Sequence, residues 1–376
     1  MNPTRFSFLI FLLISSGLFA QSISLRKVTT LPSIVQETSG IETSNLLYIW
    51  THNDSDSDPA LYKIDTLGNL LKTVFFKNTT NVDWEDVTSD GQNYYIADIG
   101  NNDNTRKNLK IYKIPNPDNV TADSISAEII SFNYPNQTKF PPDNARLNFD
   151  AEALMYFNSS LYIFTKNRTS PFTGYTYLFK LPDEPGQHTA TLLDSFKTGS
   201  GIKEQWWITA ADMSPDLKKV ALLSSDKIFV FTDFAGDNFF KGKVKTIDLG
   251  SFTQKEGLAF YTNTEFYITD EYFDLLGGRN LYQGSIKNLY SASFKDTNKF
   301  QNLLINYKKQ FGEPTISLID ETKKVNVSVM DMNGKVVAIY QMDYTQPIAI
   351  IDVVAGYYTL LNTDGKVKQE MKILID

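Results

Sequence analysis

Short segments that alternate apolar and polar positions recur between residues 22 and 295. Runs such as LLYIWT, ALYKID and YYIAD are rich in aromatic and β-branched residues, and polar turns separate them. A two-residue alternation is typical of β-strands that bury one face. This part of the chain therefore predicts an all-β fold built from many short strands.

Five of these segments share one pattern. Each begins with an acidic or small polar residue, continues with an apolar residue and a turn, and ends in a strand that finishes with polar residues. The segments are TSGIETSNLLYIWTHND, WEDVTSDGQNYYIADIGNN, AEALMYFNSSLYIFTKNR, AADMSPDLKKVALLSSD and KEGLAFYTNTEFYITDEY. One aligned column contains Ser39, Glu85, Glu152, Ala211 and Glu256. Such internal repeats are typical of folds that stack or circularise one unit.

Each repeat continues with two further strand-like runs, except the fifth, which supplies one. An unassigned strand, residues 22–30, precedes the first repeat. A β-propeller can close its ring by completing the last blade with an N-terminal strand, so we predict five four-stranded blades over residues 21–295. Six blades stay open as an alternative, because a degenerate blade could escape the alignment. The uneven repeats require insertions, such as residues 135–150.

Composition sets limits on partners and chemistry. The 376 residues are 42% hydrophobic and 13% aromatic, which is ample for more than one folded domain. The formal net charge of −7 argues against nucleic acid and anionic membrane surfaces as partners. The chain has no Cys, which excludes disulfides, thiolate metal sites, a Cys nucleophile and a lipoprotein anchor.

The first 20 residues predict a secretory signal peptide. Arg5 supplies a positive charge, residues 6–14 are apolar, and residues 15–20 bring small side chains before a cleavage point. The apolar run is too short to span a membrane, and no other segment is apolar for long enough. We expect a mature chain without a transmembrane segment that is secreted or displayed on the cell surface.

Residues 303–376 predict a separate, small β-sandwich. Short strand-like runs alternate there with turn signals such as Asn333-Gly334 and Asp364-Gly365. A polar stretch, residues 287–302, separates this region from the last repeat of the propeller.

Three features of this C-terminal region resemble a known family. They are the run VNVSVMDMNGKVVAIY, the Gly356-Tyr357 step, and a final strand with Lys366, Lys368 and Lys372. Together they resemble the type A sorting domain of the Bacteroidetes type IX secretion system. The resemblance implies an Ig-like sandwich that the type IX secretion machinery recognises, and export across the outer membrane. A generic Ig-like accessory domain is the alternative.

Carboxylates gather at one end of the predicted ring, which we call the mouth. In a propeller blade the first strand begins, and the second strand ends, on the same face, so residues at these points surround the central channel. Hard oxygen ligands suit calcium, and we expect a metal site there. The expected metal ligands are Glu85, Glu152, Glu256, Asp98 and Asp270. The residues expected to contact a further, unidentified extracellular ligand are Glu37, His52, Asp83, Asp150, Lys166, Arg168 and Glu271.

These residues also have plainer structural roles. The acids could pair with nearby bases such as Lys255, and His52, a candidate general base, could be a hydrogen-bonded residue at a strand end. The tract THNDSDSDP spaces Asp54, Asp56 and Asp58 at every second position. It lacks the Gly and the final Glu of an EF-hand loop, so it predicts a polar turn.

Two classes of function stay open from the sequence. The region up to residue 295 loosely resembles secreted propellers of the phytase-like and esterase-like group, through QKEGLAF and YITDEY. That resemblance implies a calcium-assisted phosphoesterase or esterase as one hypothesis. Scattered acids are less than a hydrolase needs, so a binding or surface protein is favoured. The tryptophans could stack a sugar or pack in the core; they are Trp50, Trp84, Trp206 and Trp207.

Overall fold

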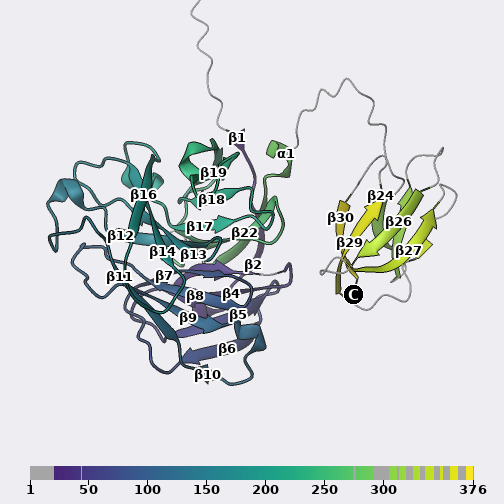
Figure 1. Cartoon of the computed structure of the whole chain (residues 1–376), viewed down its shortest axis with the longest axis horizontal. Coiled ribbons are helices and arrows are strands. Elements are labelled where there is room, and N and C mark those ends of the chain that lie inside the picture. Colours follow the sequence, from purple (N-terminus) through teal and green to yellow (C-terminus); the bar gives the residue numbers. More distant parts are fainter. Residues whose placement is uncertain are drawn as a thin grey trace, which may run out of the picture. The chain divides into compact units, whose positions relative to one another are not determined.

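The chain divides between residues 292 and 293 into two compact units (Figure 1). The computed structural model describes residues 21–43, 45–273, 277–290, 305–310, 313–318, 325–330, 335–342, 348–349, 356–362 and 370–375. The predicted signal peptide, residues 1–20, lies outside the described residues. In the part that is described, no helix combines the length and apolar character needed to cross a membrane.

The first unit consists of five antiparallel sheets, each with four main strands. Blade one contains β3 (Thr38–Glu42), β4 (Tyr48–Asn53), β5 (Ala60–Asp65) and β6 (Leu70–Phe76). Blade two contains β7 (Trp84–Ser89), β8 (Asn93–Asp98), β9 (Lys110–Pro115) and β11 (Glu128–Asn133). Blade three contains β12 (Asp150–Tyr156), β13 (Ser160–Lys166), β14 (Tyr175–Pro182) and β16 (Thr191–Lys197). Blade four contains β17 (Ala210–Met213), β18 (Val220–Leu223), β19 (Lys227–Thr232) and β20 (Lys243–Asp248). Blade five contains β21 (Lys255–Phe260), β22 (Glu265–Asp270), β23 (Asn280–Ser285) and β2 (Arg26–Thr30).

The blades form a closed ring. The inner strands pack side by side in a cycle, in the order β3, β7, β12, β17, β21 and back to β3. The N-terminal strand β2 runs antiparallel to β23 and completes blade five. The prediction of a five-bladed β-propeller is therefore confirmed, and the six-bladed alternative is wrong.

Only part of the predicted closing segment completes blade five. β1 (Gln21–Ser22) instead pairs in parallel with β20 of blade four. Between β1 and β2, Ile23 and Leu25 pack into the core cluster that blades four and five share. The segment therefore joins two blades: β1 pairs with blade four, β2 pairs with blade five, and the two apolar side chains between them pack where these blades meet. Two further short strands extend blades one and two in parallel: β10 (Ser124–Ile125) and β15 (Gly186–Thr189).

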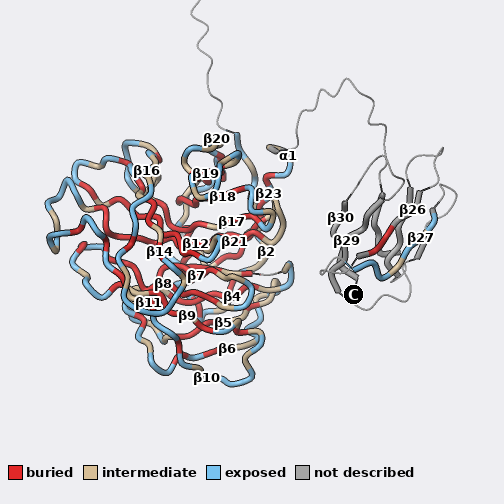
Figure 2. Tube along the Cα trace, viewed as in Figure 1, coloured by how far each residue is buried: buried red, intermediate tan, exposed pale blue. Residues whose placement is uncertain are grey.

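Apolar side chains fill the space between neighbouring blades, and Figure 2 shows buried residues along the strands around the ring. A separate cluster of buried residues lies at each of the five blade interfaces. Trp50 and Trp84 belong to the cluster between blades one and two and have no exposed surface. These two tryptophans therefore have the core role and are not available to a ligand.

Side chains of one blade satisfy the inner strand of the next. An inner strand ends its sheet, so one of its edges has no strand partner, and its backbone groups need other partners. Asp86 Oδ2 accepts a hydrogen bond from the Leu154 N–H (2.8 Å). Asp212 Oδ2 accepts one from the Phe260 N–H (2.6 Å). Asp86 is buried and Asp212 is partly buried, and their carboxylates hold neighbouring blades together.

The described strands of the second unit form two antiparallel sheets, in the orders β24-β25-β28 and β27-β26-β29-β30. Their bounds are β24 Ile305–Gln310, β25 Glu313–Leu318, β26 Val325–Met330, β27 Val336–Met342, β28 Ile348–Ala349, β29 Gly356–Asn362 and β30 Glu370–Ile375. β26 and β27 pair as the predicted hairpin requires. The Ig-like sandwich and its sorting role stay predictions.

Deleting residues 21–30 should destabilise the propeller far more than trimming an ordinary terminus. The deletion exposes the edge of β23 and removes the packing of Ile23 and Leu25, so we expect the melting temperature to fall by roughly 10 °C or more. Differential scanning calorimetry measures this. Lys27→Ala, which alters an exposed side chain and keeps the strand, is the matched control. A deletion variant that melts within a few degrees of the parent would contradict closure by β2.

Candidate functional site

Three glutamates reach the mouth from equivalent positions of their inner strands. The pairing with the second strand skips Glu85 in β7, Glu152 in β12 and Glu256 in β21. Such a β-bulge leaves the extra residue out of the ladder and re-aims its side chain. All three line a cavity of ≈ 440 Å³, and none is more than 7% exposed. The aligned column of the sequence thus corresponds to one structural position.

The other two blades depart from this pattern. At the bulge of blade one, Ser39 donates a hydrogen bond to the Glu85 carbonyl (2.6 Å), which ties the two inner strands together. Blade four has no bulge, and Ala211 pairs regularly with Leu222. The loop before β17 contributes Glu204 and Trp207 to the cavity instead. The mouth is therefore asymmetric, because three blades place a bulged glutamate there and the loop before β17 supplies a glutamate and a tryptophan instead.

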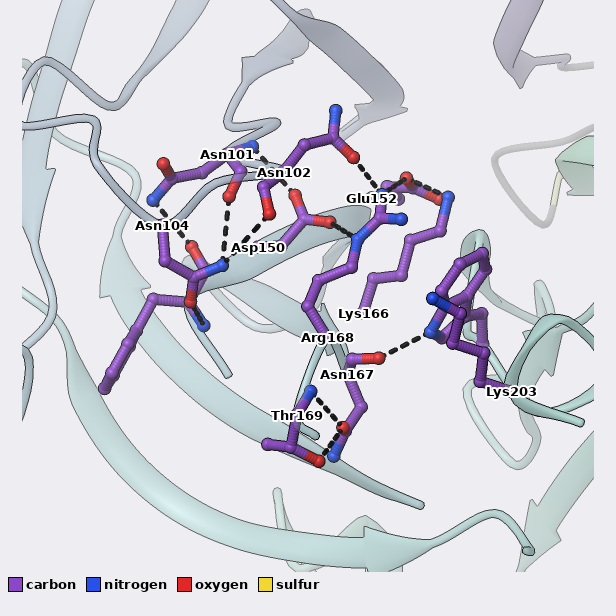
Figure 3. Close-up of polar contacts among 12 residues, drawn as sticks. Asn101, Asn102, Asn104, Asp150, Glu152, Lys166, Asn167, Arg168, Thr169 and Lys203 are labelled. Carbon is purple, nitrogen blue, oxygen red and sulfur yellow. Dashed lines mark hydrogen bonds and ion pairs between the residues drawn. The ribbon is translucent and has the colours of Figure 1, made fainter. Parts of the chain in front are cut away.

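Lys166 and Arg168 neutralise one part of the mouth (Figure 3). The Lys166 amine forms an ion pair with Glu152, and Arg168 Nε donates to Asp150 Oδ2 (2.6 Å). Burial disfavours the charge of Lys166, but the neighbouring carboxylates outweigh burial and raise the pKa of the amine. The structure therefore supports acid–base pairing for Asp150 and Glu152.

Trp207 packs against these bases. The Arg168 guanidinium lies 4.4 Å from the centre of the Trp207 ring, and the amines of Lys166 and Lys203 lie 5.0 and 5.1 Å from it. Cations over an aromatic face are favourable and hold the ring in place. Basic residues of the chain itself therefore already contact the indole ring of Trp207.

A second part of the mouth has acids without bases. Ligand oxygens of Asp54, Asp83 and Glu85, which we call the metal triad, lie within 4.8 Å of one another. Among the described residues, no hydrogen bond or ion pair reaches the side chain of Asp83 or Glu85. Burial, followed by the neighbouring carboxylates, raises the pKa of Asp83 to about 7 and that of Glu85 well above its ordinary value. A divalent cation would offset this repulsion.

Gly100 makes room for the metal triad. A Cβ atom at this position would collide with the carboxylates of Glu85 and Asp83. The Gly100 N–H also donates to the Asp83 carbonyl (3.1 Å), which holds the loop after β8 against the loop before β7. The triad therefore depends on a glycine that the acidic pattern of the sequence does not reveal.

Glu256 lacks a partner as well, although a lysine precedes it in sequence. The Lys255 amine instead donates to the carbonyls of Ser225 (2.9 Å) and Ser251 (2.7 Å). Burial lowers the pKa of Lys255 to about 8. In the part of the chain that the structure describes, nothing forms a hydrogen bond or ion pair with the Glu256 carboxylate. The bulge re-aims the side chain of Glu256, and the Lys255 amine bonds to carbonyl groups, so proximity in sequence does not neutralise this acid.

Asp98 and Asp270 do not join the other expected metal ligands. Both are fully buried and neither lines the cavity. Asp98 Oδ1 accepts a hydrogen bond from Arg106 (2.6 Å). Asp270 accepts hydrogen bonds from the Asn280 N–H (2.8 Å) and the Tyr282 hydroxyl (2.9 Å). These aspartates fasten the loops that follow β8 and β22, which is a structural role.

His52 lies in the core between blades one and two. It has no exposed surface, and its ring packs edge-on against Trp84 with ring centres 5.7 Å apart. Nδ1 lies 3.0 Å from the Asn53 carbonyl. Burial lowers the pKa of the imidazole to about 4, so the ring is neutral at physiological pH. The position fits a hydrogen-bonded core histidine and not a general base at the mouth.

Glu37 and Glu271 lie outside the cavity lining. Glu271 accepts a hydrogen bond from Gln254, which does line the cavity. Burial, together with the charge of Asp54, raises the pKa of Glu271 to about 8. The Ser57 hydroxyl lies 3.4 Å from Glu37 Oε2.

Several residues of the site do not stand out in the sequence. Asp54 belongs to the metal triad, whereas Asp56 and Asp58 are exposed in the turn. The THNDSDSDP tract therefore combines a site residue with a polar turn, which the EF-hand comparison does not reveal. The remaining unexpected lining residues are Asn102, Glu204, Thr209, Ser225, Phe252, Gln254 and Phe273. In the sequence, only their position in or next to loops at the ends of the repeated strands indicates that they could lie near the mouth.

Comparisons with known proteins do not assign a family. No family model and no curated protein sequence matches the chain. The PQQ-bound aldose sugar dehydrogenase of Streptomyces coelicolor has 9% identity and a TM-score of 0.41 over 70% of this chain and 97% of that one. The Cps50 (Swd1) β-propeller domain of Myceliophteria thermophila has 10% identity and a TM-score of 0.36 over 70% and 99%. PorZ of Porphyromonas gingivalis, a bacterial surface component of the type-IX secretion system, has 12% identity and a TM-score of 0.31 over 90% and 45%. These similarities are too distant to indicate a ligand or an activity.

In chelator-treated protein, the free energy of unfolding should fall as the pH rises from about 5 to about 8. Carboxyl groups with a raised pKa keep protons in the folded state that the unfolded chain has already released, so stability decreases across this window. The upper limit follows from Glu152, whose pKa is raised to about 7, and Glu271, at about 8. Urea denaturation at a series of pH values measures the slope.

Glu256→Gln, which cannot ionise, should flatten that decline. Glu128→Gln, at an exposed position of β11, should leave it unchanged and is the matched control. A free energy of unfolding that stays constant or increases over the same pH range would contradict the raised pKa values of the carboxyl groups at the mouth.

Proposed function

We propose that the propeller is a cation-dependent binding module of an exported protein, with calcium bound by the metal triad. The observation that carries this proposal is the triad itself: three close carboxylates, of which Asp83 and Glu85 have no base bonded to them among the described residues. Burying such a group without compensation is unfavourable. A bound cation offsets the repulsion and opens a coordination site toward the cavity.

Calcium suits this donor set better than other common ions. All three donors are carboxylate oxygens, and no His or Cys belongs to the group. Zinc prefers nitrogen and sulfur ligands. Magnesium requires a tight octahedron, whereas calcium accepts irregular oxygen shells that backbone carbonyls and water complete. The cavity beside the triad gives water or a ligand access to the ion.

The export part of the proposal rests on the two ends of the chain. The signal peptide, residues 1–20, would deliver the chain to the secretory pathway. The C-terminal region, residues 303–376, would then present the type IX sorting signal. The propeller would act outside the cell or on its surface, where calcium is abundant.

A calcium-assisted phosphoesterase or esterase is the second candidate. Lys166 and Arg168 line the same cavity as Glu85, so a phosphate group could bridge the cation and a base. Both bases are already paired with Glu152 and Asp150, however, and the buried His52 is not placed to activate a nucleophile. A binding role is favoured, because it lets Lys166 and Arg168 keep their ion pairs with Glu152 and Asp150.

Calcium should raise the melting temperature of chelator-treated protein. A ligand that binds only the folded state adds about 2.7 kcal/mol to the free energy of unfolding at a hundredfold excess over its Kd. Asp83→Asn should abolish most of that response, and Asp58→Asn, in the exposed turn, should keep it. Calorimetric titration gives the affinity. The absence of binding heat at millimolar calcium, with an unchanged melting curve, would refute the calcium site.

A chain that ends at residue 302 should fold but remain in the periplasm of its native host. The truncation removes the region that resembles a sorting domain and leaves every propeller strand. Cell fractionation with immunodetection measures where the protein accumulates, and the full-length chain is the control. Normal release of the truncated chain outside the cell would exclude the sorting role.

A further inference from the structure

We propose that the Glu256 side of the mouth binds an organic cation, an alkylammonium or alkylguanidinium group, next to the metal triad. This inference rests on the proposed binding role of the mouth and names the chemical class of its ligand. It concerns a part of the cavity that a metal ion at the triad would not fill.

The cavity is larger than one ion requires. Its volume is ≈ 440 Å³, and only Asp54 and Glu85 of the metal triad belong to its lining. Other lining residues come from the loops before β17 and β21, from β21 itself and from the loop after β22; they include Trp207, Phe252, Gln254, Glu256 and Phe273. A molecule with a chain of several carbon atoms fits such a space.

Most acids of this region have a base bonded to them, whereas the charge of Lys166 acts on Glu256 without a hydrogen bond or ion pair among the described residues. Glu152 is paired with Lys166, Asp150 with Arg168, and Glu204 with Lys203 at 3.9 Å. A divalent ion would balance most of the triad.

The remaining acid is Glu256, which is 7% exposed. No hydrogen bond or ion pair to its carboxylate occurs within the described part of the chain. A second buried oxygen, Glu152 Oε2, also has no hydrogen-bond partner there. The position therefore calls for a single positive charge that can donate hydrogen bonds.

The walls favour an organic cation over the alternatives. Phe252 and Phe273 line the cavity and are 47% and 46% exposed, so their rings are open to a ligand. Aromatic rings beside a carboxylate recognise ammonium and guanidinium groups. A single carboxylate offers too few oxygens for a second metal ion. Stacking of a sugar on Trp207 would compete with Arg168, which already lies against that ring.

Titration with matched small molecules tests this inference. N-butylguanidinium and N-butylammonium should bind the calcium-loaded protein and change its tryptophan fluorescence, because Trp207 lines the same cavity. N-butylurea has the shape of the guanidinium without its charge and should bind at least tenfold more weakly, since a charged hydrogen bond is lost. Equal binding of the urea, or no binding of either cation at millimolar concentration, would overturn the proposal.

Variants separate this site from the calcium site. Glu256→Gln should weaken N-butylguanidinium about tenfold and Phe252→Ala several-fold, with Glu128→Gln as the control. Asp83→Asn should lose calcium and keep N-butylguanidinium. Cation binding that survives Glu256→Gln unchanged, in a variant whose melting curve shows it is folded, would overturn the assignment. If calcium fails to bind but the cations bind through Glu256, the calcium proposal is refuted and this inference stands.

A peptide comparison identifies the source of the cation. An acetylated Gly-Arg-Gly amide presents the same guanidinium on a backbone. Binding tighter than N-butylguanidinium indicates a basic side chain of a protein or peptide as the natural occupant. Weaker binding indicates a free small amine or guanidine. Either result, combined with loss in Glu256→Gln, supports the site.

Discussion

The pairing of β2 with β23 is the interaction on which the rest of the structure depends. It joins residues from the beginning and the end of the propeller sequence, such as Arg26 and Gln283, which lie 257 positions apart. The mouth exists only because the ring is closed: Glu85, Glu152 and Glu256 come from three different blades and meet around one channel. Without closure, the three glutamates would lie at separate strand ends. Their charges would not act on one another, and no cavity would form between them.

Two kinds of buried carboxylate occur around the channel, and their hydrogen bonds distinguish them. Asp86 and Asp212 each accept backbone N–H groups from their own strand and from the next blade. Such acids are part of the scaffold, because backbone N–H groups donate hydrogen bonds to their oxygens. Glu85 and Glu256 are also buried but have no such donors among the described residues. Uncompensated burial is a cost that a scaffold does not require, which is why these acids indicate a ligand site.

The asymmetry of the ring decides what the mouth can bind. A bulge with a glutamate in every blade would give a uniformly acidic ring. Blade four lacks the bulge and contributes Trp207, while blade three contributes Lys166 and Arg168. The acids near blades one and two thus remain without bases, and those of blade three are neutralised. One cavity consequently offers a metal-binding corner and an aromatic, singly charged corner.

The sequence by itself determined the ring and the acidic column. Alternation with a period of two specifies strands and their buried faces, and the repeated glutamate two positions before an apolar residue aligns β7, β12 and β21. It did not determine which acids share a site. Asp98 and Asp270 occupy the strand-end positions expected at the mouth, yet groups from their own blades bind them. Asp54 enters the metal triad from a tract that reads as a turn. Those outcomes depend on loop paths and on neighbours from other blades, and only the closed tertiary structure brings such partners together.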